Sequence, residues 1–285
     1  MNKHRIKNLR NELGLYLYLS KRAPELQNCL VQLHQQLRED DTLYVSIAFE
    51  QPQVLSWQID LFHKYMNHGQ LLVCDNSCNT LKREEIKELC RVKNIPYLPL
   101  PSNPTRHVNR SHGNAMSWIH QHVLKQLENV HVAFIDHDLL PVQPWDMSKK
   151  LMKQPCYGLR NMGKSGSWSL WAGYCAYQTG VIHKLRSNFL YDFSLELDTG
   201  GRLWQYYYQG IVNDTMSFAQ SEVIAIPDHQ TGIAQRIQII DQSWLHVGGV
   251  SYSRHQEQTL QFFSKLITAL LAGASWDTLV LDGLR

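Results

Sequence analysis

The chain has 285 residues, of which 44% are hydrophobic and 19% are charged, and its formal net charge is +3. This composition is that of an ordinary globular protein with enough apolar material for a sizeable core, and the small, evenly spread charge excludes nucleic acid as the main partner. The six cysteines include no CxxC pair, which indicates a reduced, cytoplasmic protein rather than a disulfide framework.

The N-terminal segment MNKHRIKNLR is basic and lacks the apolar stretch of a signal peptide. No run approaches the roughly 18 apolar residues of a membrane span, and LITALLAGA reaches about half that length. We therefore expect no stable membrane span and a cytoplasmic location. The basic segment is compatible with transient association with the inner face of the membrane.

Strand and helix patterns alternate through the first half of the chain. Short apolar or extended runs predict strands at 42–49, 70–75, 95–101 and 131–135. Apolar residues at helical spacing predict helices at 54–66, 81–94 and 115–127. This alternation is typical of βαβ units and predicts a parallel sheet in an α/β fold.

The second half follows a different pattern. Alternating residues predict a half-buried strand at 167–178, and helical spacing predicts a helix at 200–211. Short strands are expected within EVIAIP and SWLHVGG, and a strong amphipathic helix at 258–273 is expected to bury Leu271 among other residues. Because no repeat or linker interrupts the chain, we expect a single domain over residues 1–285.

Polar clusters follow three of the predicted strands: Glu50 the first, Asp75 the second, and Asp136-His137-Asp138 the fourth. Ligands of open parallel sheets bind outside the carboxyl ends of the strands, near the point where the strand order reverses. An Asp-x-Asp pair there can hold one hard divalent cation and leave positions for phosphate oxygens. Solvated turn carboxylates or helix caps are the alternative, but the position directly after a buried strand favours the metal.

Four segments together resemble the donor-binding half of GT-A-fold glycosyltransferases, especially the family-two type: VSIAFEQ, LLVCDNSCN, RSHGNAMSWI and VAFIDHDLLPV. The resemblance implies a GT-A-like three-layer α/β/α domain with a mostly parallel central sheet and a mixed, loop-rich acceptor-side half. The nucleotide-sugar donor half would span about 42–145, and the acceptor half with the C-terminal helix about 146–285.

The resemblance also implies roles for individual residues. Asp75 would contact the nucleotide base, and Asp136 would lie at the ribose and, with Asp138, at Mn²⁺ or Mg²⁺. The helix start near the donor diphosphate would consist of His112, Gly113 and Asn114. The chain departs from the family pattern after the first strand, where AFEQPQ replaces a P-x-Y-N segment, so that Glu50 is a candidate nucleotide contact at a position where a small polar group is common.

Enzymes of this type often take a third metal ligand, a histidine, from a late segment, and His246 in SWLHVGGVSY resembles it. Imidazole suits Mn²⁺ better than Mg²⁺. His229 is the rival candidate, and a purely structural role is the alternative for either histidine.

An inverting transferase needs a general base that deprotonates the acceptor hydroxyl. Asp198 in LELDTGGRLW is the candidate, with Glu196 second. The alternative is that Asp198 has no catalytic role, since Asp198 or Thr199 would cap the helix predicted from Gly200 onward. Neither assignment holds for a retaining enzyme.

The leading hypothesis is therefore an inverting, metal-dependent glycosyltransferase, which moves a sugar from a nucleotide-diphosphate sugar to the hydroxyl of a glycan or other acceptor. A nucleotidyltransferase acting on a sugar phosphate would need a Gly-rich, basic loop after the first strand, where this chain has FEQPQVLSW. A non-catalytic nucleotide- or metal-binding module is the third hypothesis. The donor base, the sugar, the acceptor and the oligomeric state stay open.

Overall fold

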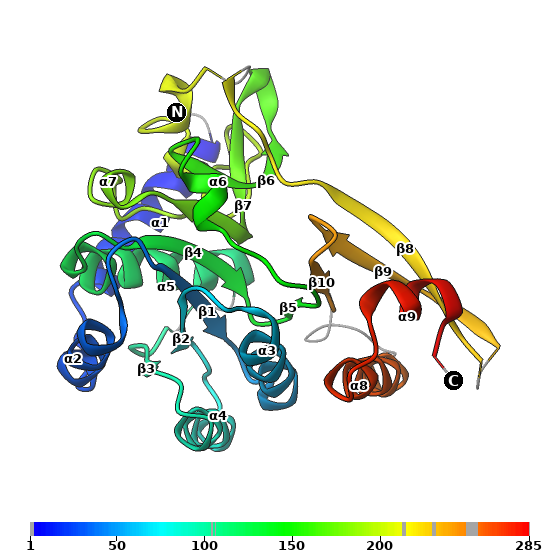
Figure 1. Ribbon diagram of the computed structural model, residues 1–285. Coiled ribbons are helices and arrows are strands. Elements are labelled where there is room, and N and C mark those ends of the chain that lie inside the picture. Colours follow the sequence, from blue (N-terminus) through cyan, green and yellow to red (C-terminus); the bar gives the residue numbers. More distant parts are fainter. Residues whose placement is uncertain are drawn as a thin grey trace. The chain divides into compact units, whose positions relative to one another are not determined.

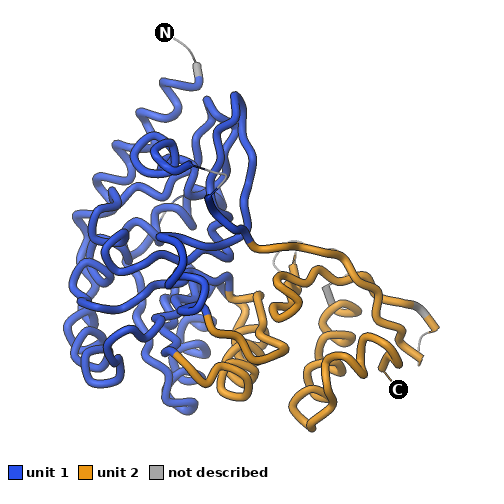
Figure 2. The backbone as a smooth tube through the Cα atoms, turned by 45° about the horizontal axis from the view of Figure 1, so that its top comes forward, with its two compact units in different colours: residues 1–50, 69–136, 147–218 blue, residues 51–68, 137–146, 219–285 orange. Residues whose placement is uncertain are grey.

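The computed structural model describes residues 3–103, 105, 107–212, 215–229, 232–248 and 256–284. The chain divides into two compact units, each built from three stretches of sequence (Figure 2). Unit 1 comprises residues 1–50, 69–136 and 147–218, and unit 2 comprises residues 51–68, 137–146 and 219–285. The donor and acceptor halves predicted to meet near residue 145 stay a prediction.

Within its described residues, unit 1 contains a six-stranded sheet in the order β3-β2-β1-β4-β7-β6 (Figure 1). Its strands are β1 (Thr42–Ala48), β2 (Gln70–Asp75), β3 (Tyr97–Pro99), β4 (His131–Asp136), β6 (Cys156–Met162) and β7 (Trp168–Tyr177). The first four in this order pair in parallel, whereas β7 pairs antiparallel with β4 and with β6. The prediction of an α/β fold with a mostly parallel central sheet is confirmed.

Helices pack on both faces of this sheet. The main helices of unit 1 are α1 (Lys3–Leu19), α2 (Leu26–Gln36), α4 (Thr80–Val92) and α5 (Val108–His122), and the short ones are α6 (Ser148–Leu151) and α7 (Thr179–Ile182). On one face, Cys74 of β2 belongs to a buried cluster with Leu33 of α2 and Trp118 of α5. The next residue, Asp75, points to the opposite face because side chains alternate along a strand, and there Arg83 of α4 approaches it.

Unit 2 is built around an antiparallel sheet, four-stranded within the described residues, in the order β5-β10-β9-β8. Its elements are α3 (Pro52–Tyr65), β5 (Leu139–Pro141), β8 (Ser221–Asp228), β9 (Ile233–Ile240), β10 (Trp244–His246), α8 (Gln256–Leu271) and α9 (Trp276–Asp282). Leu61 of α3, Ile239 of β9 and Leu266 of α8 share one buried cluster. Across the described part of the chain, no helix combines the length and apolarity needed to cross a bilayer.

Three predictions about the second half are wrong. The helix predicted at 200–211 is replaced by two short 3-10 helices, η3 (Gly201–Leu203) and η4 (Tyr208–Gly210). Gly200 has a left-handed backbone with φ of 89°, and Arg202 is drawn into an ion pair with buried Asp192, so tertiary contacts override the helical spacing. β7 is buried along nearly its whole length rather than on one face, because it lies between two strands of the sheet. Leu271 is exposed, whereas Leu266 of the same helix is fully buried.

Candidate functional site

The ends of the parallel strands bring several predicted residues to one edge of the sheet in unit 1, which we call the carboxyl edge. The pairing register places Ala48 of β1 opposite Asp75 and Ile47 opposite Asp136. The strand order reverses between β1 and β4, which is the position where open α/β sheets bind ligands. Unit 1 contains seven of the predicted site residues: Glu50, Asp75, His112, Gly113, Asn114, Asp136 and Asp198. The other two, Asp138 and His246, belong to unit 2.

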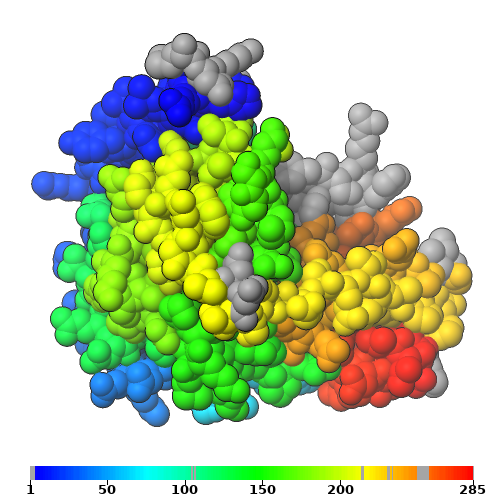
Figure 3. Space-filling view, turned by 90° about the horizontal axis from the view of Figure 1, so that it is seen from above, coloured from blue at the N-terminus to red at the C-terminus, as the bar shows by residue number. Residues whose placement is uncertain are grey.

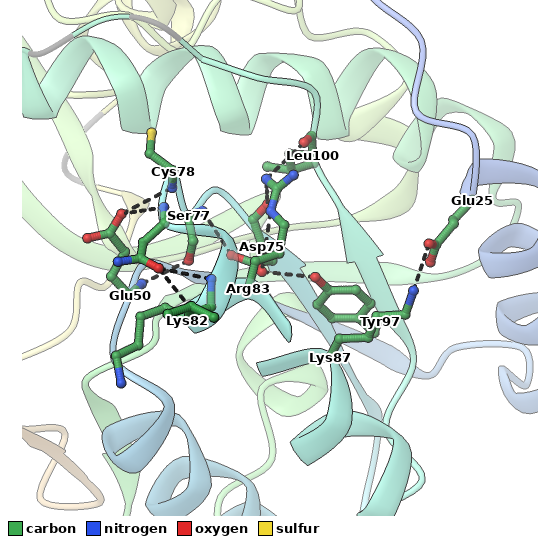
Figure 4. A network of polar contacts seen from close by, with 12 residues as sticks. Glu25, Glu50, Asp75, Ser77, Cys78, Lys82, Arg83, Lys87, Tyr97 and Leu100 are labelled. Carbon is green, nitrogen blue, oxygen red and sulfur yellow. Dashed lines mark hydrogen bonds and ion pairs between the residues drawn. The ribbon is translucent and has the colours of Figure 1, made fainter. Parts of the chain in front are cut away.

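Asp75 is fully buried, and other parts of unit 1 bind its carboxylate (Figure 4). Oδ1 accepts a hydrogen bond of 2.8 Å from the Ser77 amide, and Oδ2 accepts one of 2.9 Å from the Tyr97 hydroxyl. Arg83 Nε lies 3.8 Å from Oδ2. Burial, together with the charge of Asp75, raises the pKa of Tyr97 well above its ordinary value, so that the phenol stays a hydrogen-bond donor. In this arrangement Asp75 shapes the loop after β2, and its contact with a nucleotide base stays a prediction.

Glu50 also binds the loop after β2 (Figure 4). Its Oε1 accepts hydrogen bonds from the amides of Cys78 at 3.1 Å and Asn79 at 2.9 Å, and its own amide donates to Ser77 Oγ at 2.9 Å. Its backbone is left-handed, with φ of 54°, which is costly for a residue other than glycine or asparagine. These contacts give the carboxylate a structural use at the start of α4, and its role in nucleotide binding stays a prediction.

Asp136 ends β4 with its carboxylate partly exposed, at 23%. Its Oδ1 lies 3.8 Å from Nδ1 of His112 in α5. Gly173 of the neighbouring strand β7 leaves room for it, because a Cβ there would collide with Asp136 Oδ2 and with the ring of Trp171. The structure thus brings two predicted residues together, Asp136 and His112, and shows that a glycine is needed beside them.

Asn114 is part of a buried set of polar side chains near the start of α5. Its Nδ2 donates to Asn103 Oδ1 at 3.2 Å, and Asn103 Nδ2 in turn donates to the carbonyl oxygen of Ser111 at 2.9 Å. Asn76, directly after β2, donates to Ser111 Oγ at 2.9 Å. Asn114 Oδ1 is buried and has no hydrogen-bond partner among the described residues, so it is an acceptor available to a ligand.

Gly113 precedes Asn114 and has a packing function. A Cβ at this position would lie 2.7 Å from the carbonyl oxygen of Phe189, so a side chain would force α5 away from that segment. This close approach accounts for the glycine without a diphosphate, and its place near the donor stays a prediction.

Asp198 lies on the surface of unit 1 beside the first turn of α5. Its Oδ1 accepts hydrogen bonds from Asn109 Nδ2 and, at 2.7 Å, from the amide of Thr199. Gly200 is the N-cap of η3 and no side chain caps it, so the expectation that Asp198 caps a helix from Gly200 is wrong. The second candidate base, Glu196, forms an exposed ion pair of 2.5 Å with Lys164.

Asp138 and His246 face each other in unit 2. His246 Nε2 lies 3.7 Å from Asp138 Oδ1, and the Val247 amide donates to the carbonyl oxygen of Asp138 at 2.9 Å. On the other side of the ring, Nδ1 lies 2.7 Å from Oε1 of Gln238, which is opposite His246 in the β9–β10 register. An amide oxygen can only accept a hydrogen bond, so Nδ1 carries the proton and Nε2 is then the nitrogen with the lone pair.

This pair fits a divalent metal ion. Two ligand atoms each about 2.0–2.2 Å from one ion are at most about 4.4 Å apart, and the separation of 3.7 Å lies within this limit. A metal-binding histidine commonly donates its other ring N–H to an oxygen, as His246 does to Gln238. Among the described residues no group of three or more His, Cys, Asp or Glu side chains forms a ready-made metal site. The prediction that Asp136 shares the ion with this pair stays a prediction.

A cavity of about 300 Å³ adjoins His246 within unit 2, and its lining includes Gln238, Arg236 and Phe263.

His229, the rival metal ligand, is hydrogen-bonded through Nε2 to the carbonyl oxygen of Asp282 at 2.7 Å, and this bond anchors it to the C-terminal segment. In SWLHVGGVSY, Gly249 and the residues after it lie outside the described residues.

Sequence reasoning missed Gly173, Asn103 and Gln238. Gly173 sits in a strand whose alternation gave no sign of the carboxylate beside it. Asn103 and Gln238 lie 11 and 8 residues from the side chains that they orient. Only the pairing of β9 with β10 could have indicated Gln238, and that hairpin was not predicted.

The fold is similar to solved structures of glycosyltransferases at low sequence identity. A mannosyltransferase from Pyrobaculum calidifontis in complex with GDP-Man and Mn²⁺ has 8% identity and a TM-score of 0.39, covering 65% of this chain and 56% of that chain. Glucosyl-3-phosphoglycerate synthase from Mycobacterium tuberculosis, with Mn²⁺, UDP and glucosyl-3-phosphoglycerate, has 12% identity and a TM-score of 0.36, covering 58% and 64%. The bifunctional glycosyltransferase WbbM has 10% identity and a TM-score of 0.35, covering 52% and 34%.

The chain thus spans between about a third and two thirds of the length of these structures. No protein-family model matches the chain, and no curated protein matches its sequence.

Proposed function

We propose that this chain is a metal-dependent glycosyltransferase that moves a sugar from a nucleotide-diphosphate sugar to an acceptor hydroxyl with inversion. The observation that carries the proposal is the carboxyl edge of unit 1, where Asp75 and Asp136 end strands on either side of β1, at the reversal of strand order. The glycine that makes room for the Asp136 carboxylate supports a ligand role for this acid rather than a packing role.

The donor is assigned to the carboxyl edge. Asn114 Oδ1, a buried acceptor, can take a hydrogen bond from a hydroxyl or amide group of the donor. Asp136, partly exposed, can accept from ribose hydroxyls, and His112 beside it can donate to a phosphate oxygen when its ring nitrogen is protonated. Asp75 acts as a positioning residue that fixes the loop after β2 through Ser77 and Tyr97.

Asp138 and His246 are assigned to the metal, with Gln238 orienting the imidazole. The bound ion would neutralise the diphosphate and make it a better leaving group. A carboxylate oxygen with an imidazole nitrogen favours Mn²⁺ over Mg²⁺.

Asp198 is assigned as the general base. Its hydrogen bonds from Asn109 and Thr199 both engage Oδ1, and we assign Oδ2 to the acceptor proton. The acceptor oxygen gives its proton to Asp198 and forms a bond to the anomeric carbon. The bond from that carbon to the diphosphate breaks, and the nucleoside diphosphate leaves with the electron pair.

The test is a thermal-shift screen of nucleoside diphosphates and their sugars, with and without Mn²⁺, on the native chain and on Asp138→Ala. A ligand at a hundredfold excess over its dissociation constant stabilises the folded state by about 2.7 kcal/mol. We expect one nucleotide to raise the melting temperature only with Mn²⁺, and Asp138→Ala to abolish this rise. Glu257→Gln, an exposed change in α8, is the matched control. Cooperative melting with no shift for any nucleotide would refute the proposal.

A further inference from the structure

Helix α1 in unit 1 has apolar residues on its outer side, whereas its inner side combines polar and apolar residues. Asn8, Asn11, Leu15 and Tyr18 are buried against the unit. On the outer side, Leu9 and Leu13 are each 63% exposed and Tyr16 is 73% exposed. The outer set is completed by Ile6 and Leu17, both exposed. A surface helix normally turns polar residues to solvent, so the apolar outer side of α1 departs from the usual pattern.

The outer residues form one continuous stripe. At about 100° per residue, positions 6, 9, 13, 16 and 17 fall within an arc of about 100° of the helix circumference. Arg5 lies at one margin of this arc and Arg10 at the other, and both are exposed. The stripe therefore has a basic margin on each side. The N-terminal segment, blue in Figure 3, lies at the surface in that view.

The inner side holds α1 in this orientation through polar bonds. Asn8 donates to Asp192 at 3.2 Å, and Asn11 donates to the Tyr191 hydroxyl at 2.8 Å. Glu12 forms an ion pair of 2.7 Å with Arg202. Rotating the helix to bury its stripe would break these bonds and leave polar groups in the interior unpaired, which is costly.

We propose that α1 binds flat on a membrane surface that contains anionic phospholipids. The stripe would enter the boundary between head groups and acyl chains, and Arg5 and Arg10 would reach lipid phosphates at its margins. The charge at the margins favours this occupant over a second copy of the chain. A second copy would present the same basic margins, and Glu12, the one acid of α1, is already paired with Arg202.

Co-sedimentation of the purified chain with vesicles tests the proposal. We expect binding to phosphatidylcholine vesicles with 30 mol% phosphatidylglycerol, weakened by salt, and little binding to pure phosphatidylcholine. Each basic residue near an anionic surface contributes a factor of about 5, so Arg5→Gln with Arg10→Gln should lower the partition coefficient about 25-fold. Leu9→Gln with Leu13→Gln should lower it at least tenfold.

The matched control is Leu81→Gln with Val92→Gln, two leucine- or valine-to-glutamine changes in α4 at residues that are 74% and 66% exposed. This variant should bind vesicles like the native chain. Thermal melting shows that each variant folds. Because the assay contains no donor or acceptor, its result does not depend on glycosyl transfer.

Two results would overturn the proposal. One is vesicle binding that is absent, or that is equal for the native chain and the α1 variants. The other is a native chain that sediments as a dimer in the ultracentrifuge and does not bind vesicles, while Leu13→Gln makes it monomeric. That result would assign the stripe to a second copy.

Discussion

Asp75 in unit 1 and Asp138 in unit 2 show two outcomes of one sequence signal, an acid placed just after a buried strand. Asp75 is fully buried, and each of its oxygens accepts a hydrogen bond from its own unit. Asp138 is 15% exposed, and its side chain faces an imidazole nitrogen at a distance too long for a hydrogen bond. The first acid therefore has a structural use within unit 1, whereas the second is the one that we propose as an ion ligand.

Two histidines repeat this difference. His120 in α5 is fully buried and is hydrogen-bonded through both ring nitrogens, to Ser187 Oγ and to the carbonyl oxygen of Ile182, each at 2.8 Å. His246 is oriented through Nδ1, and its Nε2 faces a carboxylate. The bonds around a polar side chain, rather than its position after a strand or in a helix, therefore distinguish a structural residue from a candidate ligand.

The largest expected effect concerns Asp138. Asp138→Ala should lower Mn²⁺-dependent transfer about a thousandfold, or about 4 kcal/mol in activation free energy, since the metal loses an anionic ligand. Its free energy of unfolding without metal should change little, because the side chain makes no buried hydrogen bond among the described residues. The transfer rate is measured by product formation, and the free energy of unfolding is measured by urea unfolding of the same preparation. A variant that unfolds much more easily at unchanged activity would place Asp138 with Asp75 as a structural acid.

Asp75 should behave in the opposite way. Asp75→Ala should lower the free energy of unfolding by about 3–5 kcal/mol, because Tyr97 and the Ser77 amide lose their acceptor and Arg83 loses its counter-charge. Chemical denaturation measures this loss. Glu88→Ala is the control, since it breaks an ion pair with Arg91 that is exposed on both sides and should have no measurable effect. A small loss for Asp75→Ala, accompanied by lost nucleotide binding, would restore the role predicted from sequence.

The strands of unit 1 could be predicted because their chemistry is local. Residues 43–48, 71–74 and 132–135 are mostly apolar, and the acids that follow them mark the carboxyl edge without any knowledge of packing. For the same reason Asp75, Asp136 and Asp138 could be selected as candidates. Their separation into a structural acid and candidate ligands could not be predicted, because it depends on Tyr97, Gly173 and Gln238, which are distant in sequence.

Helix α1 was not predicted because its inner side mixes Asn8 and Asn11 with Leu15 and Tyr18 while its outer side is apolar, so that no single apolar face marks the helix. The helix predicted at 200–211 failed for a related reason. Arg202 is buried there by its pairing with Asp192, and no property of a local window indicates that an arginine will be internal. In both cases buried polar pairs decide the structure, and these pairs join residues about 10 to 190 positions apart.

The pH dependence of the free energy of unfolding tests whether His120 is the structural histidine of this pair. Burial lowers its pKa to about 4, below the ordinary value of 6.5, so the unfolded chain binds a proton that the folded chain does not between these values. Its contribution to stability is complete above pH 6.5 and is lost as the pH falls toward 4, by roughly 3 kcal/mol in total. His120→Gln should remove this part of the pH dependence of urea unfolding, whereas His63→Gln, an exposed change in α3, should leave it unchanged. An unchanged profile for His120→Gln would contradict a neutral, structural histidine.

Gln238 gives the smallest effect but the most direct test that His246 is oriented as a ligand. Gln238→Leu removes the oxygen at Nδ1, so the imidazole no longer holds its proton on that nitrogen and a fraction of the rings presents a protonated Nε2 toward Asp138. Affinity for Mn²⁺, measured by calorimetry on the metal alone, should fall 10- to 100-fold, or about 1.4–2.7 kcal/mol. Gln235→Leu lines the same cavity and should bind the ion like the native chain. Equal affinities in the two variants would mean that the hydrogen bond from His246 holds the β9–β10 hairpin together and that the metal lies elsewhere.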